Sequence, residues 1–191
     1  MTELVTLAEE LQTFFEARKW RFCFIGGLAV QEWAELRATK DVDLTLLTGF
    51  GNERPYIDEL LAHYQGRRPD AADFAERRRV LLLQSANGIG IDIAMGAFPY
   101  EALAIERSRK VELRAGHFIR ICTAEDLIVF KAFASRVQDW RDVEMTIVRQ
   151  GDEKLDWPYI LEQLTPLAEL KEEPAIVEHL LALRTRLQRH R

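Results

Sequence analysis

The sequence predicts an α+β fold, in which a small mixed β-sheet flanked by helices precedes a helical C-terminal region. Two observations predict it. Up to residue 122, short apolar runs bounded by turn residues alternate with amphipathic helical patterns, and from Thr123 onward every periodic segment is helical. We therefore expect an α/β core over residues 1–122 and a helical subdomain over residues 123–191 that completes the cleft of the core. With 191 residues, 48% of them hydrophobic, the chain can bury such a core without a disulfide or a structural metal.

The elements of the core follow from periodicity and turn chemistry. Strands are expected at residues 21–25, 41–47, 79–86, 89–95, 110–113 and 118–121, and helices at 2–18, 28–36, 53–65 and about 98–107. Asn87-Gly88 separates two apolar runs, which is a strong hairpin signal because both residues accept positive φ. Gly26-Gly27 stands where the first strand ends and the second helix begins.

The C-terminal region is expected to hold helices at residues 123–137, 139–150, 156–170 and 174–189. Thr123 is expected to cap the first helix, with Asp126 in place of the usual capping-box Glu or Gln. If the first two helices were unbroken, a turn of about 100° per residue would put four polar side chains on one stripe: Lys131, Ser135, Asp139 and Asp142. That stripe either faces a common cleft or forms the charged surface of an amphipathic helix.

Composition limits the classes of function. A net charge of −5 argues against broad coating of nucleic acid, although local basic clusters remain at residues 67–68, 77–79 and 184–191. Cys23 and Cys122 are expected to be buried free thiols, and no Cys/His pattern indicates zinc. No signal peptide is visible and no apolar run approaches the roughly 20 residues that cross a bilayer. We therefore expect a cytoplasmic protein without a membrane partner.

Asp41 and Asp43 lie in a segment that otherwise has the character of a buried strand. Side chains alternate faces along a strand, so both carboxylates point to one side while Val42 and Leu44 point into the core. Two ionised carboxylates so close together repel each other unless a cation lies between them. Oxygen ligands on a rigid strand suit Mg²⁺, which fills its remaining positions with water and substrate phosphates.

Asp92 is a third candidate ligand, because it is a lone acid in the apolar strand at 89–95. If that strand lies beside 41–47, the three carboxylates can hold two Mg²⁺ ions, with Mn²⁺ as an alternative, for phosphoryl or nucleotidyl transfer. Gly26-Gly27 adds a second signal, because a backbone without Cβ atoms can approach a phosphate and the next helix begins with free N–H groups. The competing interpretation places the acids on the wet face of a half-exposed sheet.

Together these residues resemble the nucleotidyltransferase superfamily with the DNA polymerase β-like fold. The signature of that superfamily is an apolar strand, a Gly-Gly or Gly-Ser pair, a short helix, an acid–apolar–acid strand and a later third acid. The matching segments here are Ile25-Gly26-Gly27, Asp41-Val42-Asp43 and Asp92. One departure is that Gly27 stands where many members have a serine, which leaves only backbone N–H groups to meet a phosphate.

Two further stretches resemble the AbiEii-type branch, which includes toxins of toxin–antitoxin systems. The stretch RATKDVDL at 37–44 is similar to its Arg-x-Thr-x-Asp-h-Asp-h pattern, which small antibiotic nucleotidyltransferases share in part. This likeness implies that Arg37 and Thr39 lie on the nucleotide side. The stretch 123–147 resembles the later helical motif of the branch, and its matching positions are Lys131, Arg136, Asp139 and Asp142. The implied roles are a nucleotide-phosphate contact for the two basic residues, and orientation or deprotonation of the acceptor for the two acids.

The activity that the resemblance implies is Mg²⁺-dependent transfer of a nucleoside monophosphate from an NTP to a hydroxyl acceptor. Asp41 and Asp43 would ligate both ions. Asp92 would ligate the ion beside the attacking hydroxyl and help to deprotonate it, while Gly26 and Gly27 would cradle the triphosphate. The acceptor stays open among a tRNA 3′ end, a protein and a small hydroxylated antibiotic, and a cognate antitoxin is a further expected partner. Two other classes compete: a catalytically silent nucleotide-binding module, and an α+β interaction domain without a site.

Overall fold

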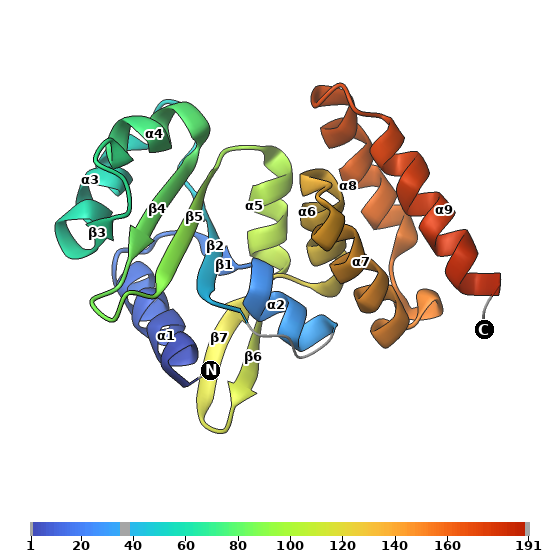
Figure 1. Ribbon diagram of the computed structural model, residues 1–191, viewed down its shortest axis with the longest axis horizontal. Coiled ribbons are helices and arrows are strands. Elements are labelled where there is room, and N and C mark those ends of the chain that lie inside the picture. Colours follow the sequence, from blue (N-terminus) through green and yellow to red (C-terminus); the bar gives the residue numbers. More distant parts are fainter. Residues whose placement is uncertain (1, 35–38, 190–191) are drawn as a thin grey trace. The chain divides into compact units, whose positions relative to one another are not determined.

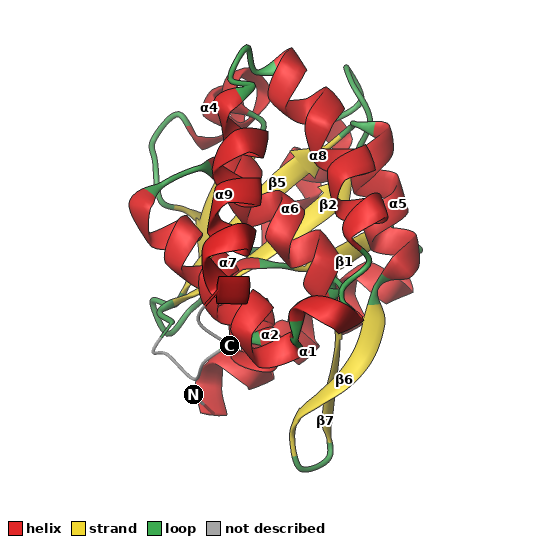
Figure 2. Ribbon diagram, turned by 90° about the vertical axis from the view of Figure 1, so that its right-hand side faces the viewer, coloured by secondary structure: helices red, strands yellow, loops and turns green. Residues whose placement is uncertain are grey.

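The computed structural model describes residues 2–34 and 39–189 and divides into two compact units. The first comprises Met1–Leu28 and Ala38–Cys122, and the second comprises Ala29–Arg37 and Thr123–Arg191. The first unit holds the β-sheet with its covering helices, and the second is helical (Figures 1 and 2). Within the described ranges, none of the helices is both long and apolar enough to cross a membrane.

The first unit is built on a mixed seven-stranded sheet with the strand order β3-β4-β5-β2-β1-β7-β6 among the described residues. Two strand pairings at the centre of the sheet position the candidate site residues: β2 runs parallel to β5 and antiparallel to β1. The strands are β1 (Phe22–Phe24), β2 (Asp41–Leu47), β3 (Gln65–Gly66), β4 (Val80–Gln84), β5 (Gly90–Gly96), β6 (Arg109–Arg114) and β7 (His117–Ile121). The mixed sheet that the sequence predicts is therefore confirmed, and the β6–β7 hairpin extends beyond the other strands (Figure 2).

Helices cover both faces of this sheet. On one face lie α1 (Thr2–Ala17), α3 (Arg54–His63) and α4 (Ala71–Arg78), and on the other lies α5 (Pro99–Arg107) (Figure 1). The ring of Phe14 contacts the rings of His63 and Tyr64, which joins α1 to α3. Leu44 and Leu46 are fully buried, while Thr45 of the opposite face donates a hydrogen bond to Glu101 of α5. The alternation of β2 therefore separates an apolar face from a polar one.

The β4–β5 hairpin forms where Asn87-Gly88 predicts it, but its turn differs from the expected one. Of these two described residues only Gly88 has positive φ, at 77°. The hydroxyl of Ser85 accepts a hydrogen bond from the N–H of Ile89 at 3.1 Å, and the Ser85 carbonyl accepts one from Gly88. These bonds close a longer loop than a two-residue turn, so the second positive φ is not required.

Two elements of the first unit have no counterpart in the sequence prediction. These are the two-residue strand β3 and the helix α4: Gln65 was the last residue of the predicted helix 53–65, and no element was predicted over residues 66–78. Arg79 ends α4 in the left-handed conformation, with φ at 56°. A two-residue strand has no detectable period, because an alternation needs at least four residues to be visible. Cys23 and Cys122 are buried free thiols, as predicted.

The second unit contains α6 (Ala124–Ala134), α7 (Val137–Gln150), the short 3₁₀ helix η1 (Asp152–Lys154), α8 (Trp157–Leu170) and α9 (Ala175–Arg189). Thr123 caps α6 as predicted, because its hydroxyl accepts a hydrogen bond from the Asp126 N–H at 3.2 Å. The interruption between the two predicted helices lies at Ser135, which adopts the left-handed conformation with φ at 58°, and not at residue 138; the condition of an unbroken helix is therefore not met. The remaining helix α2 (Gly26–Trp33) follows β1 directly.

Candidate active site

The three predicted carboxylates lie on one face of two adjacent strands. Asp43 on β2 is the direct register partner of Asp92 on β5, and Asp41 is the partner of Gly90. Direct partners in a sheet point to the same side, so Asp43 and Asp92 are neighbours across the strand boundary. Both strands keep these acids half-buried while the alternate residues form the core. The juxtaposition that the site requires is therefore present. We call Asp41, Asp43 and Asp92 the acidic row.

The Gly26-Gly27 turn lies directly against the acidic row. Gly26 has positive φ, at 57°, and a Cβ at this position would overlap the Asp43 carboxylate. The N–H of Gly27 donates a hydrogen bond to Asp43 Oδ2 at 3.2 Å. In this structure the Gly27 N–H is therefore directed at the acid, and the turn orients Asp43.

Thr39 fills the space beside Gly27. A Cβ on Gly27 would overlap the Thr39 hydroxyl, which donates a hydrogen bond to the Asp41 carbonyl at 3.2 Å. The Thr39 hydroxyl thus lies where a serine side chain at position 27 would extend. Arg37, the other residue expected on the nucleotide side, lies outside the described residues.

Arg67 is a site residue that the sequence prediction missed. It follows β3, and its guanidinium forms an ion pair with Asp92. A Cβ on Gly90 would meet both Asp41 Oδ1 and Arg67 Nη1, the latter at 3.1 Å. The Arg67 guanidinium therefore lies between the carboxylates of Asp41 and Asp92. The Arg67-Arg68 cluster is visible in the sequence, but only the pairing of β3 with β4 brings Arg67 toward β5.

Burial raises the pKa of Asp92 to about 6. The Arg67 guanidinium opposes this effect, whereas the negative charges of Asp43 and Asp41 reinforce it. A carboxyl group with this pKa is ionised at neutral pH but can accept a proton more readily than an exposed aspartate.

The raised pKa of Asp92 predicts a pH-dependent loss of stability. The folded protein holds this proton up to about pH 6 and an unfolded chain releases it near 3.8, so ionisation in the fold costs free energy as pH rises between these values. Because the side chain is 33% exposed, we expect a cost of only about 1–2 kcal/mol. Urea unfolding in EDTA should show Asp92→Asn more stable than wild type at pH 8, with the difference vanishing near pH 4. An equal difference at both pH values would contradict the shift.

Neither a protein-family model nor a curated protein matches the chain. Solved structures do match over nearly the full length. ANT(2″)-Ia in complex with adenylyl-2″-tobramycin aligns with a TM-score of 0.54 at 16% identity, covering 98% of this chain and 99% of that chain. An antigenic nucleotidyltransferase-like protein from Paracoccidioides brasiliensis aligns with a TM-score of 0.53 at 15% identity, covering 95% of this chain and 94% of that chain. The chain has the nucleotidyltransferase fold. This confirms the predicted fold, and at these identities the likeness speaks for the fold alone.

The acidic row of this nucleotidyltransferase fold has the donor chemistry of a divalent-cation site. Asp41, Asp43 and Asp92 supply carboxylate oxygens from two rigid strands, which is the ligand type that Mg²⁺ and Mn²⁺ prefer. In the described part of the chain, however, no three His, Cys, Asp or Glu side chains are arranged as a complete metal site. The Arg67 guanidinium supplies a positive charge to Asp92 instead.

The polar side chains that the sequence predicts on one stripe of the second unit also lie together, but on two packed helices and not on one straight helix. Lys131 Nζ lies 3.0 Å from Asp139 Oδ1 and 2.8 Å from Asp142 Oδ2, and all three side chains are buried. Arg136 Nε lies 2.6 Å from Asp139 Oδ2. The break at Ser135 lets α7 fold back on α6, and the Ser135 hydroxyl accepts a hydrogen bond from the Trp140 indole. The cluster is thus an ion-pair network between two helices, and these bonds occupy two of the three ammonium hydrogens.

The electrostatics of this cluster favour its ionised form. Burial alone would raise the pKa of Asp139, but hydrogen bonds from Arg136 and Lys131 outweigh it and hold this pKa below its usual range. The associated stability is present above the unfolded pKa and is lost as pH falls through the folded one. The nucleotide and acceptor roles of Lys131, Arg136, Asp139 and Asp142 stay predictions.

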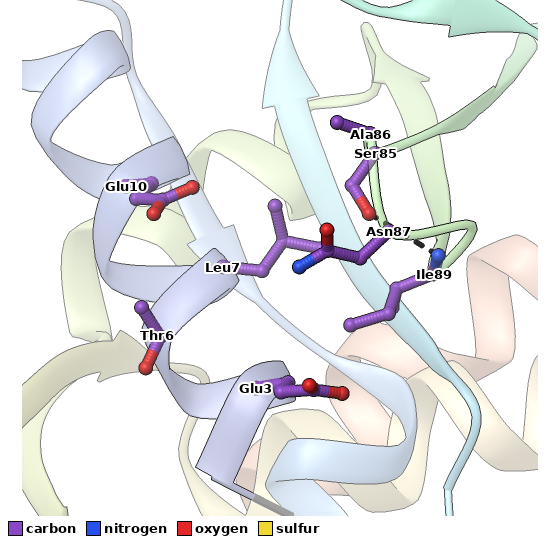
Figure 3. A pocket seen from close by; sticks show the side chains of 8 residues that line it. All are labelled: Glu3, Thr6, Leu7, Glu10, Ser85, Ala86, Asn87 and Ile89. Atoms are coloured by element: carbon purple, nitrogen blue, oxygen red, sulfur yellow. Dashed lines mark hydrogen bonds between the residues drawn. The ribbon is translucent and has the colours of Figure 1, made fainter.

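A separate pocket of about 310 Å³ lies between α1 and the β4–β5 turn (Figure 3). Its lining side chains are Glu3, Thr6, Leu7, Glu10, Ser85, Ala86, Asn87 and Ile89. Ile89 continues the β5 alternation on the side opposite Asp92, and α1 covers the face opposite the acidic row. This pocket is therefore on the other side of the sheet and is not part of the acidic site.

Proposed function

We propose that this protein is a Mg²⁺-dependent nucleotidyltransferase that moves a nucleoside monophosphate from an NTP to a hydroxyl group of a small acceptor, with release of pyrophosphate. The observation that carries the proposal is the register of Asp43 with Asp92 on one sheet face, directly against the Gly26-Gly27 turn. Repulsion among close carboxylates is a cost for the folded protein unless they bind a cation. The nucleotidyltransferase fold provides the setting in which such a row has a use.

Each residue of the row has a distinct task in this proposal. Asp41 and Asp43 hold the divalent cation, which when bound would neutralise charge on the transferring phosphate and on the leaving pyrophosphate. Asp92, with a pKa of about 6, accepts the proton of the attacking hydroxyl. Gly27 fixes the direction of the Asp43 carboxylate, and the Thr39 hydroxyl, which donates to the Asp41 carbonyl, holds the start of β2 beside the turn.

A small acceptor is favoured over RNA by the pairing of the basic cluster. Arg68 and Arg77 both pair with Asp70, and Arg79 pairs with Glu53, so these arginines are already engaged by the protein's own carboxylates. The net charge of −5 points the same way. One matching structure contains an adenylylated antibiotic, adenylyl-2″-tobramycin, and that protein is covered over 99% of its length.

The finer assignment to an AbiEii-type toxin is an alternative within the same chemistry. It rests on the stretches 37–44 and 123–147, and it implies a tRNA or protein acceptor and a cognate antitoxin. The two versions differ in the acceptor and share the acidic row, so one experiment separates them.

The test is transfer of label from each α-³²P-labelled NTP in the presence of Mg²⁺. Three arms offer a panel of hydroxylated antibiotics, total tRNA, or the protein alone, and each is repeated with EDTA. We expect an EDTA-sensitive labelled product in the small-molecule arm, and none with Asp43→Asn. Label in tRNA would show that the acceptor is RNA and not a small molecule. Binding of NTP without transfer in any arm would instead favour the catalytically silent module.

A further inference from the structure

The position of Arg67 follows from one row of the sheet. The Arg67 N–H donates to the Leu82 carbonyl at 2.9 Å, Leu82 is the register partner of Asp92, and Asp92 is the partner of Asp43. Leu82, Asp92 and Asp43 therefore lie side by side on β4, β5 and β2, and Arg67 continues this line of register partners at the edge of the sheet. Neighbouring strands are about 4.8 Å apart, and an extended arginine side chain is long enough to cross one strand and reach the next. Arg67 thus approaches the acids from the edge of the sheet.

Arg67 differs from the other arginines of its cluster in its partner. The Arg68 guanidinium donates two hydrogen bonds to Asp70. Its charge centre also lies 4.4 Å from the centre of the Phe74 ring. Arg67 pairs with Asp92 and lies over Gly90, beside the Asp41 carboxylate. The absence of a side chain at Gly90 is what leaves room for both groups. The cluster therefore sends one guanidinium into the acidic row and keeps its neighbour on the surface.

The guanidinium and a divalent cation cannot share the Asp92 oxygens at low cost. Both are positively charged, and two cations bound to the same carboxylate lie only a few ångströms apart. At that separation their repulsion is several times the thermal energy even in a well-screened site. We propose that Arg67 is the resident counter-ion of the acidic row in the metal-free protein, and that binding of a divalent cation displaces its guanidinium from Asp92. This inference rests on the proposed function, because it assumes that the row binds such a cation.

Two consequences follow from this competition. First, the metal-free fold tolerates three close carboxylates because Asp92 forms an ion pair with Arg67. Second, the acidic row binds metal more weakly than the same carboxylates would without Arg67. The Arg67 side chain, which is already 30% exposed while paired, would then lie at the edge of the site, where a nucleotide brings phosphate oxygens. Arg67 is accordingly a positioning residue whose charge sets the metal affinity.

The test is Mn²⁺ binding without nucleotide, measured by isothermal titration and by the loss of the free-ion EPR signal. Arg67→Met removes the charge and keeps an apolar stem, and we expect it to bind Mn²⁺ about tenfold more tightly than wild type. Arg67→Lys keeps the charge and should bind within about twofold of wild type. Arg68→Gln removes a charge one residue away, outside the row, and should also stay within about twofold.

The controls separate this inference from the proposed function. Asp43→Asn should abolish the binding, which assigns it to the acidic row. If wild type binds Mn²⁺ and Arg67→Met binds equally or more weakly, the counter-ion inference is overturned and the nucleotidyltransferase proposal stands. If neither protein binds Mn²⁺ at millimolar concentration, the counter-ion inference is overturned, and the nucleotidyltransferase proposal is decided by label transfer from NTP, whose phosphates complete the metal coordination. Circular dichroism of each variant establishes that it is folded, and the ¹⁵Nε resonance of Arg67 in wild type should shift on addition of diamagnetic Mg²⁺. An unmoved resonance at saturation would also contradict displacement.

Discussion

Asp43→Asn will reduce nucleotidyl transfer by about 10³-fold, a rise in the activation barrier of about 4 kcal/mol, with little change in the fold. Asp43 is the central member of the acidic row, with Asp92 as its register partner and Gly27 as its hydrogen-bond donor. Asparagine keeps the size of the side chain and an acceptor oxygen but removes the charge that would hold a divalent cation. The measurement is the single-turnover rate of label transfer at saturating Mg²⁺ and NTP.

The matched control for this prediction is Asp58→Asn. Asp58 lies on α3, pairs with Arg54 at 2.8 Å, and is 57% exposed, so loss of its charge should change the rate by less than about twofold. Unfolding of both variants in urea should give transitions close to that of wild type. Full transfer activity in a folded Asp43→Asn protein would remove the acidic row from the mechanism and leave only a likeness of fold.

Lys131→Met will destabilise the second unit by about 3–5 kcal/mol at neutral pH. The Lys131 ammonium lies between Asp139, which is 0% exposed, and Asp142, which is 5% exposed. Removal of the cation leaves two buried negative charges, and the Arg136 guanidinium pairs with that of Asp139. The cost should shrink toward pH 4, because burial favours the protonated form of Asp139 once the Lys131 ammonium no longer lowers its pKa. The measurement is urea unfolding at pH 7.5 and at pH 4.5.

Two further variants make this result specific to the cluster. Lys154→Met removes an exposed ammonium on η1 and should cost less than about 0.5 kcal/mol. The double variant with Lys131→Met and Asp142→Asn removes one charge of each sign and should recover part of the lost stability. A cost below about 1 kcal/mol for Lys131→Met would show that the ion pairs contribute little, and would return Lys131 to its predicted role at a nucleotide phosphate.

The stretches with a strong local signal were predicted well. The alternation of Asp41-Val42-Asp43-Leu44 indicated a strand with two acids on one face, and the structure has that strand over the predicted residues. Asn87-Gly88 located the hairpin, and Thr123 located the start of α6. Each of these signals depends on neighbours within about four residues, so the chain carries it whatever the rest of the fold does.

The relations between distant stretches needed the tertiary structure. That β5 is the parallel neighbour of β2 was only a condition in the sequence argument, because strand order leaves no mark on local periodicity. The helix break was placed at residue 138 and lies at Ser135, because a left-handed residue other than glycine has no reliable sequence signal: Lys19 and Arg79 adopt the same conformation. Lys131 nevertheless met Asp139 and Asp142, because two packed helices can join the same residues that one straight helix would align.

The sequence by itself determined the chemistry of this protein: which strands are apolar, which positions carry acids, and where glycine replaces a side chain beside them. Only the tertiary structure decided how those acids are balanced. It placed Arg67 against Asp92 through a two-residue strand at the sheet edge, and it raised the pKa of Asp92 by burial. The physical reason is that electrostatic interactions depend on distance in space and on exclusion of water, and neither quantity is written in the spacing of residues along the chain.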